Sequence, residues 1–145
     1  LAYRRTPDHS LDTDTFAFVT LEEMLKNSDM VTIHCPLNAQ TENLINQKTI
    51  TMMKNSVLII NTSRGAVLNE ADVVQALNSG KIKMIAVDVL AVEPPEYNNQ
   101  MIFHKNCIVT PHIAWMPKET RIRLLEIAAK NLDCFLSGKP QNIVN

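Results

Sequence analysis

The chain has 145 residues, of which 46% are hydrophobic and 20% are charged, and its formal net charge at pH 7 is −1. This length suits one domain with a substantial core, and the near-neutral charge excludes a broad basic surface for nucleic acid or an anionic membrane. No apolar run approaches the roughly 20 residues that span a bilayer, so we expect no membrane partner.

Three cysteines are scattered along the chain, at positions 35, 107 and 134, and none has the spacing of a metal site. An odd number of cysteines without a disulfide pattern is typical of buried thiols in a reducing compartment. Because no signal peptide is visible either, the sequence predicts a cytoplasmic protein.

Short extended segments alternate with helices in the first part of the chain. A capping box, in which Thr20 is followed by Glu23, predicts the start of one helix. The elements predicted here are a strand end at Leu1–Tyr3, a β-like segment at Phe16–Val19, a helix from Thr20, a strand at Met30–His34 and a helix at Asn46–Met53.

The centre of the chain has the pattern of a βαβ unit. Ser56–Asn61 is an apolar run typical of a strand buried on both faces. A helix follows over Glu70–Asn78 and ends at Gly80, and a second strand is predicted over Met84–Leu90. Since the crossover between parallel strands is right-handed, the loops after both strands should emerge at the same carboxyl edge of the sheet.

The last part of the chain continues the alternation. A helical turn is predicted near Met101–His104 and a strand over Asn106–Thr110. Lys118–Leu136 is the longest predicted helix, because its apolar residues form one broad stripe at helical spacing. The sequence shows no linker or internal boundary, and the alternation predicts an α/β fold with a mostly parallel sheet.

Four residues with useful chemistry stand at the ends of predicted strands: Arg64, Asp88, Glu93 and His112. An imidazole can move a proton near neutral pH, and a carboxylate beside it can fix its tautomer. A guanidinium fork fits a substrate carboxylate. Together these groups suit the reduction of a 2-oxoacid, for which a cofactor must supply the hydride.

Other interpretations remain open at this point. Taken singly, each of the four residues is more often part of a solvated turn or a helix cap. Ser63 raises the alternative of a Ser-His-Asp hydrolase, but no glycine precedes it in the spacing of a nucleophile elbow. The four histidines show neither i, i+4 pairing nor a cysteine companion, so no metal site is predicted.

Four motifs resemble the NAD(P)-dependent D-2-hydroxyacid dehydrogenase family, which includes phosphoglycerate, glycerate (hydroxypyruvate reductase) and D-lactate dehydrogenases. The similarity runs from Leu1 to Asn145 and implies a Rossmann-like, doubly wound, mostly parallel sheet. The motifs are Val31–Leu37 (VTIHCPL), Asn61–Gly65 (NTSRG), Ala86–Val89 (AVDV) with Glu93-Pro94, and Thr110–Ala114 (TPHIA).

The resemblance implies a role for each matched position. Arg64 would bind the substrate carboxylate and carbonyl, His112 would be the acid/base, and Glu93 would be its partner. Asp88 would lie near the nicotinamide carboxamide. The other cofactor-binding positions that it implies are Cys35, Pro36, Thr41, Thr62, Ser63 and Ala114.

Two features depart from the family pattern. The glycine-rich phosphate loop and the first strand, which precede the strand ending at Leu1–Tyr3, are absent, and so is the substrate domain. Since Leu1 is not a methionine, we expect a piece of a longer chain, a truncated cofactor domain that alone binds dinucleotide weakly and shows no measurable turnover.

The second departure concerns the cofactor. Family members that use NAD usually carry an acidic residue after the strand that ends here at Tyr3, whereas this sequence has Arg4 and Arg5. Two cations without a carboxylate suit a 2′-phosphate, which favours NADP over NAD.

The resemblance implies a small 2-oxoacid substrate of the hydroxypyruvate or glyoxylate type, and a homodimer when full length. Two alternatives stay open. The family fold also occurs in dinucleotide-sensing corepressors, and the sequence could belong to an inactive truncated fragment.

Overall fold

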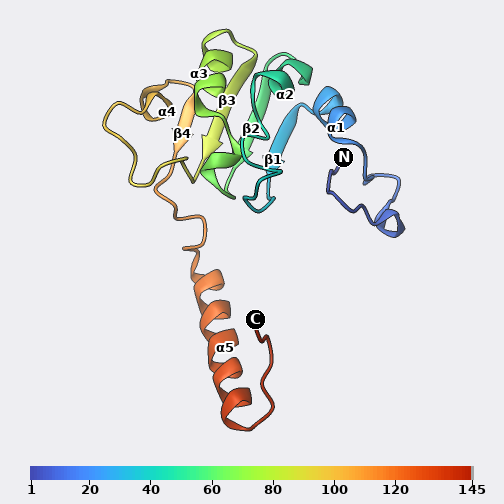
Figure 1. The fold of residues 1–145 in the computed structure, drawn as a ribbon, viewed down its shortest axis with the longest axis vertical. Helices are drawn as coiled ribbons and strands as arrows, with labels where there is room; N and C mark the ends of the chain where they lie inside the picture. Colours follow the sequence, from blue (N-terminus) through green and yellow to red (C-terminus); the bar gives the residue numbers. More distant parts are fainter. Residues whose placement is uncertain (145) are drawn as a thin grey trace. The chain divides into compact units, whose positions relative to one another are not determined.

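The computed structural model describes residues 1–144 and divides the chain into two compact units, residues 1–111 and the part from His112 onward. The first unit contains a four-stranded sheet in the order β1-β2-β3-β4, with every neighbouring pair parallel (Figure 1). The strands are β1 (Met30–Ile33), β2 (Val57–Asn61), β3 (Ile82–Val87) and β4 (Cys107–Val109).

The carboxyl ends of the four strands lie in register. Ile33 pairs with Asn61, Asn61 with Val87, and Val87 with Val109. The loops that follow the strands therefore begin side by side along one edge of the sheet, as predicted for parallel strands joined by crossovers.

The crossovers carry α2 (Gln47–Met52), α3 (Glu70–Asn78) and α4 (Gln100–Phe103). Because successive strands are neighbours and parallel crossovers are right-handed, the three helices lie on the same face of the sheet. The core forms between these helices and that face of the sheet, and both helices and strands contribute fully buried side chains. Its most buried members include Leu25, Ile59, Val73, Ile82, Ile85 and Met101.

The prediction that the strand beginning near Ser56 is buried on both faces was wrong in part. Along β2, Val57, Ile59 and Asn61 are buried, whereas Leu58 and Ile60 are only half-buried. The physical reason is the common hand of the crossovers, which brings helices to one face. An unbroken apolar run does not by itself distinguish a strand covered on both faces from one covered on a single face.

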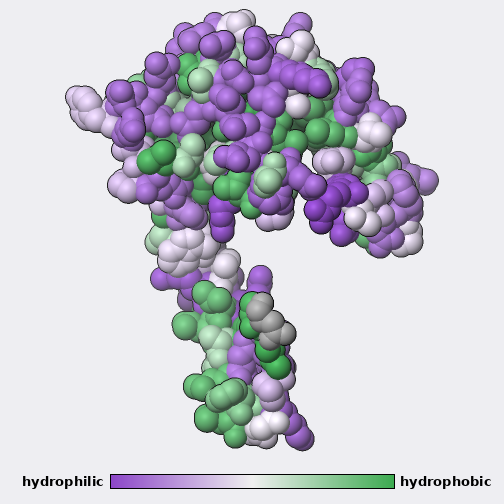
Figure 2. Space-filling model, viewed as in Figure 1, coloured by the Kyte–Doolittle hydropathy of each residue, from purple (hydrophilic) through white to green (hydrophobic). Residues whose placement is uncertain are grey.

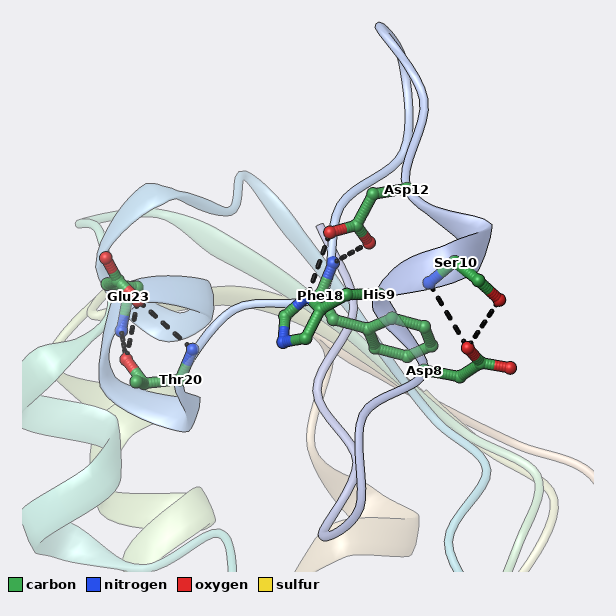
Figure 3. Close-up of polar contacts among 7 residues, drawn as sticks. All are labelled: Asp8, His9, Ser10, Asp12, Phe18, Thr20 and Glu23. Carbon is green, nitrogen blue, oxygen red and sulfur yellow. Dashed lines mark hydrogen bonds and ion pairs between the residues drawn. The ribbon is translucent and has the colours of Figure 1, made fainter.

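Helix termini follow the predicted signals closely. Helix α1 (Leu21–Asn27) begins at Thr20, whose hydroxyl accepts the Glu23 N–H at 3.2 Å while the Glu23 carboxylate accepts the Thr20 N–H at 3.1 Å (Figure 3). Helix α3 has the predicted bounds and is followed by Gly80, at a φ of +76° that favours glycine. Local capping chemistry is therefore sufficient to place these two helices.

Strand bounds differ more from the predictions. The strand expected over Met84–Leu90 is β3, which begins at Ile82 and ends at Val87, so Asp88 follows the strand. The two extended segments near the N-terminus meet in a single parallel bridge between Ala2 and Phe18. An unpredicted 3-10 turn, η1 (His9–Leu11), lies between them.

The second unit consists mainly of α5 (Lys118–Leu136), which has the predicted bounds. Its apolar side chains are exposed within this unit, and Figure 2 shows hydrophobic surface gathered along it. Among residues 1–144, no helix has the length and apolar character needed to cross a membrane.

The one-sided core gives a stability prediction for the 145-residue chain. Ile85 and Met84 are neighbours on β3, with exposed fractions of 0% and 40%. We expect Ile85→Ala to lower the free energy of unfolding by about 2–5 kcal/mol, because it leaves a cavity in the core. Met84→Ala should cost less than about 1 kcal/mol. Urea unfolding of both variants tests this, and equal losses would contradict one-sided burial.

Candidate active site

The loops at the carboxyl edge are fixed by a buried asparagine at the end of β2. Asn61 is 0% exposed, and its Nδ2 donates to the Arg64 carbonyl at 2.9 Å. Its Oδ1 accepts the Ser63 N–H at 3.0 Å and the Ser63 hydroxyl at 2.9 Å. A buried amide must be paired, so it imposes the shape of the loop that carries Arg64.

The same asparagine reaches the next strand. Its backbone carbonyl accepts the N–H of Asp88 at 2.9 Å. Asp88 is 4% exposed, and the hydroxyl of Thr110, which follows β4, donates to its carboxylate. Three successive strand ends are thus joined by hydrogen bonds, and the Asp88 carboxylate is oriented within them.

The Arg64 loop also touches the loop that carries Glu93. A Cβ placed on Gly65 would lie 1.9 Å from the Leu90 carbonyl carbon and 2.4 Å from the Ala91 nitrogen. Only a glycine allows two backbones to approach this closely. Glu93 is exposed, and its Oε1 accepts the Leu90 N–H at 2.9 Å, so Arg64, Asp88 and Glu93 belong to one cluster of loops.

Arg64 itself is exposed, and its Nη1 donates to the Ser63 carbonyl at 2.7 Å. A guanidinium has five N–H donors, so this bond orients the group and leaves most donors available to a ligand. Thr62, also predicted as a cofactor contact, is exposed on the same loop.

The loop after β1 lies beside this cluster. The Asn43 N–H donates to the Ala66 carbonyl at 2.8 Å, and Ile45 forms a parallel bridge with Leu68. Within the loop, the Thr41 hydroxyl donates to the Pro36 carbonyl at 2.6 Å. This turn is thus fixed by the side chain of Thr41.

Arg5 connects this loop to the N-terminal segment. Its Nη1 donates to Gln40 Oε1 at 3.0 Å, although the two residues are 35 positions apart. Arg4 and Arg5 are both exposed. The structure therefore places Arg5 beside the loop containing Pro36 and Thr41.

Asp8 is the nearby carboxylate that could neutralise Arg4. Its Oδ1 instead accepts both the hydroxyl and the N–H of Ser10, at 2.6 and 3.2 Å (Figure 3). These hydrogen bonds lower the pKa of Asp8, with a smaller contribution from Arg4. Asp8 is thus held mainly by its own turn.

The three cysteines are free thiols of intermediate burial, and for two of them burial disfavours the thiolate. Burial raises the pKa of Cys35 above its ordinary value. Burial, and secondarily the negative charge of Glu70, raise the pKa of Cys107 to about 11. In the described part of the chain, no group of three or more His, Cys, Asp or Glu side chains could hold a metal ion.

His112 and Ala114 belong to the second unit and are described with it. His112 has a φ of 55°, a left-handed conformation that is uncommon for a residue with a side chain. Its carbonyl accepts the Trp115 Nε1–H at 2.9 Å, and the Met116 N–H donates to the Ile113 carbonyl at 2.9 Å. The histidine thus lies in a defined turn before α5.

The sequence reasoning missed the two residues that orient the predicted ones, Asn61 and Thr110. A signal was present for Asn61, because an amide that ends an apolar strand must find partners when it is buried. Thr110 gave no comparable signal, since its contact with Asp88 depends on the register between β3 and β4.

A parallel sheet with right-handed crossovers, and with polar side chains gathered where its strands end, defines a nucleotide-binding α/β domain of the Rossmann type. The comparison with protein families makes this specific. Residues 1–114 match the family described as "D-isomer specific 2-hydroxyacid dehydrogenase, NAD binding domain".

Individual relatives agree with this match. The chain is 46% identical over 145 residues to a hydroxypyruvate reductase of Blautia hydrogenotrophica, covering all of this chain and 45% of that protein. It is 42% identical over 128 residues to a glycerate dehydrogenase of Methylorubrum extorquens, covering 87% of this chain and 41% of that protein. A solved D-lactate dehydrogenase of Aquifex aeolicus, complexed with NAD and lactic acid, superposes with a TM-score of 0.80 at 27% identity, covering 94% of this chain and 46% of that one.

The chain therefore belongs to the D-isomer specific 2-hydroxyacid dehydrogenase family, and its described fold is that of the NAD-binding domain. It spans less than half of the length of these relatives.

The contact at Gly65 gives a second stability prediction. We expect Gly65→Ala to destabilise the 145-residue chain by about 1–3 kcal/mol or more, because the added Cβ overlaps the Leu90 backbone. Gly80→Ala is the matched control, since nothing lies within 4 Å of its Cβ and its cost, about 1 kcal/mol, arises from the positive φ alone. Urea unfolding that ranks Gly80→Ala as the more damaging change would contradict this interpretation.

Proposed function

We propose that the polypeptide containing this chain is an oxidoreductase that reduces a small 2-oxoacid, of the hydroxypyruvate or glyoxylate type, to the D-2-hydroxyacid. The observation that carries the proposal is the joining of the Arg64 and Glu93 loops through the contact between Gly65 and Leu90. Family membership and the two relatives, named as a hydroxypyruvate reductase and a glycerate dehydrogenase, support the substrate class.

In this proposal Arg64 binds the substrate. Its planar fork matches a carboxylate and can also polarise the adjacent carbonyl, which a flexible ammonium would do less well. The hydrogen bond to the Ser63 carbonyl orients the fork before a substrate arrives, which lowers the entropy lost on binding.

His112 and Glu93 are proposed as the acid/base pair. In the direction of reduction, His112 donates a proton to the oxygen that develops negative charge, and the Glu93 carboxylate stabilises the imidazolium that holds this proton. In this direction the proton comes from the charged imidazole of His112, which is regenerated from solvent after each turnover.

The residues present suit a nicotinamide dinucleotide, which supplies the hydride when bound. The buried carboxylate of Asp88, oriented by Thr110, is a fixed acceptor for an amide such as a carboxamide. Thr62, Ser63, His112 and Ala114 are proposed to contact the nicotinamide side, and Cys35, Pro36 and Thr41 the adenosine side.

Arg4 and Arg5 are proposed to bind a 2′-phosphate, with Gln40 holding Arg5 in place. By analogy with the family, we also propose a cytoplasmic homodimer.

The proposal is tested by following NADPH and NADH oxidation against a panel of 2-oxoacids. The assay uses the longest polypeptide that the gene encodes. We expect Arg64→Ala to lower kcat/KM for hydroxypyruvate or glyoxylate by about 10²- to 10³-fold, because it removes donors aimed at developing charge. Arg64→Lys should recover only part of the activity, because an ammonium lacks the fork.

Lys54→Ala is the matched control for Arg64. Lys54 precedes β2 as Arg64 follows it, and it forms an exposed ion pair with Asp29 at 2.8 Å. The control removes one cation from the opposite end of the same strand and should leave kcat/KM within about twofold, as expected for an exposed pair. Cofactor binding without turnover of any oxoacid would overturn the reductase and favour a dinucleotide sensor.

The cofactor preference is tested separately. We expect the double variant Arg4→Ala/Arg5→Ala to raise the KM for NADPH by about 10- to 100-fold, because hydrogen bonds between charged groups contribute about 1.5–3 kcal/mol. The KM for NADH serves as the internal control and should not change, and Gln40→Ala should give a smaller effect in the same direction. A wild-type enzyme that prefers NADH would refute the assignment of these arginines.

A further inference from the structure

We propose that Glu70 is a positioning residue for the acid/base chemistry, because its carboxylate fastens the loop that carries Glu93. This inference rests on the role proposed above for Glu93. Glu70 is the first residue of α3 and, in sequence, suggests only an acidic residue suited to a helix N-terminus.

Both carboxylate oxygens of Glu70 are used by the loop between β3 and α4. Oε1 accepts the N–H of Ala91 at 2.7 Å, and Oε2 accepts the Nδ2–H of Asn99 at 2.9 Å. Ala91 and Asn99 lie on either side of Glu93, at the beginning and end of a stretch whose residues 91–98 are all exposed. One half-buried side chain therefore ties both ends of an exposed loop to the helix.

Asn99 is itself fixed in orientation. Its Oδ1 accepts the Met101 N–H at 2.9 Å and caps α4, so its Nδ2 must face Glu70. A flipped amide would lose the cap. Glu70 therefore meets two N–H donors, and only a group with two acceptor oxygens satisfies both.

The backbone contacts at the start of the loop depend on the same anchor. Leu90 donates its N–H to Glu93 and lies against Gly65, and Ala91 is the next residue. Fixing Ala91 thus holds the turn in which the Glu93 carboxylate is oriented.

Three variants separate this role from general stabilisation. Glu70→Gln keeps the size of the side chain but presents an amide donor to one of the two N–H groups. Asn99→Ser keeps an N-cap for α4 and removes only the bond to Glu70. Asp72→Asn is the matched control, because Asp72 lies in the same first turn of α3 but accepts the Gln47 N–H of α2, at 2.8 Å.

The experiment measures steady-state reduction of hydroxypyruvate or glyoxylate by the longest polypeptide that the gene encodes. We expect Glu70→Gln to lower kcat by about tenfold with an unchanged KM for NADPH, because a small displacement of a catalytic group reduces the rate more than it reduces cofactor binding. Asn99→Ser should act in the same direction, and Asp72→Asn should change kcat by less than about twofold. Thermal unfolding of each variant shows whether it is folded.

The pH profile supplies a readout that a merely structural role would not move. In the proposed pair the Glu93 carboxylate favours the charged imidazole, so displacing Glu93 should shift the alkaline limb of kcat/KM to lower pH. We expect this shift for Glu93→Gln and a smaller one in the same direction for Glu70→Gln, with none for Asp72→Asn.

The outcomes are distinguishable. If Glu93→Gln leaves the alkaline limb in place, the acid/base proposal fails and this inference fails with it. If Glu93→Gln shifts the limb but folded Glu70→Gln keeps wild-type kcat and pH profile, the positioning role of Glu70 alone is overturned.

Discussion

The candidate site depends on the hydrogen bonds of the buried Asn61 side chain at the end of β2. A buried amide without partners costs about 1–3 kcal/mol, and in Asn61 both the Nδ2 and the Oδ1 are hydrogen-bonded. Its side chain fixes the Ser63–Arg64 turn and its carbonyl accepts the Asp88 N–H. One residue thus sets the geometry of two neighbouring loops, and the Gly65 contact extends this order to the loop of Glu93.

Side chains at the candidate site are more exposed the further they lie from the sheet, and this gradient suits the proposed chemistry. Asn61 and Asp88 are buried and hydrogen-bonded to neighbouring strand ends, whereas Arg64 and Glu93 are exposed and bond to the backbone nearby. Groups that meet a substrate need to be accessible, while their orientation has to come from groups beneath them. Asn61 and Gly65 supply this support, and in our proposal so does Glu70.

Much of this arrangement was predictable from sequence, because its causes are local. The Thr20–Glu23 capping box and the apolar stripe of α5 each determine an element within a few residues. The grouping of Arg64, Asp88 and Glu93 followed from parallel topology alone. The one-sided burial of β2 was not predictable, since it depends on which face receives helices. The roles of Thr110 and Glu70 depend on register and on loop paths, and neither has a sequence pattern.

The hydrogen bond between Arg64 and the Ser63 carbonyl shows why the loop sequence Asn-Thr-Ser-Arg-Gly works as a unit. The carbonyl that accepts from the guanidinium belongs to the residue whose N–H and hydroxyl are held by Asn61. The buried Asn61 amide therefore orients the Arg64 guanidinium indirectly, by fixing Ser63. The glycine that follows removes the side chain that would separate this loop from Leu90. Asn61 supplies the buried hydrogen bonds, Ser63 the acceptor that orients the guanidinium, Arg64 the charge and Gly65 the space for close approach. A substitution at Asn61 or Gly65 would therefore displace Arg64 although neither residue contacts a substrate in our proposal.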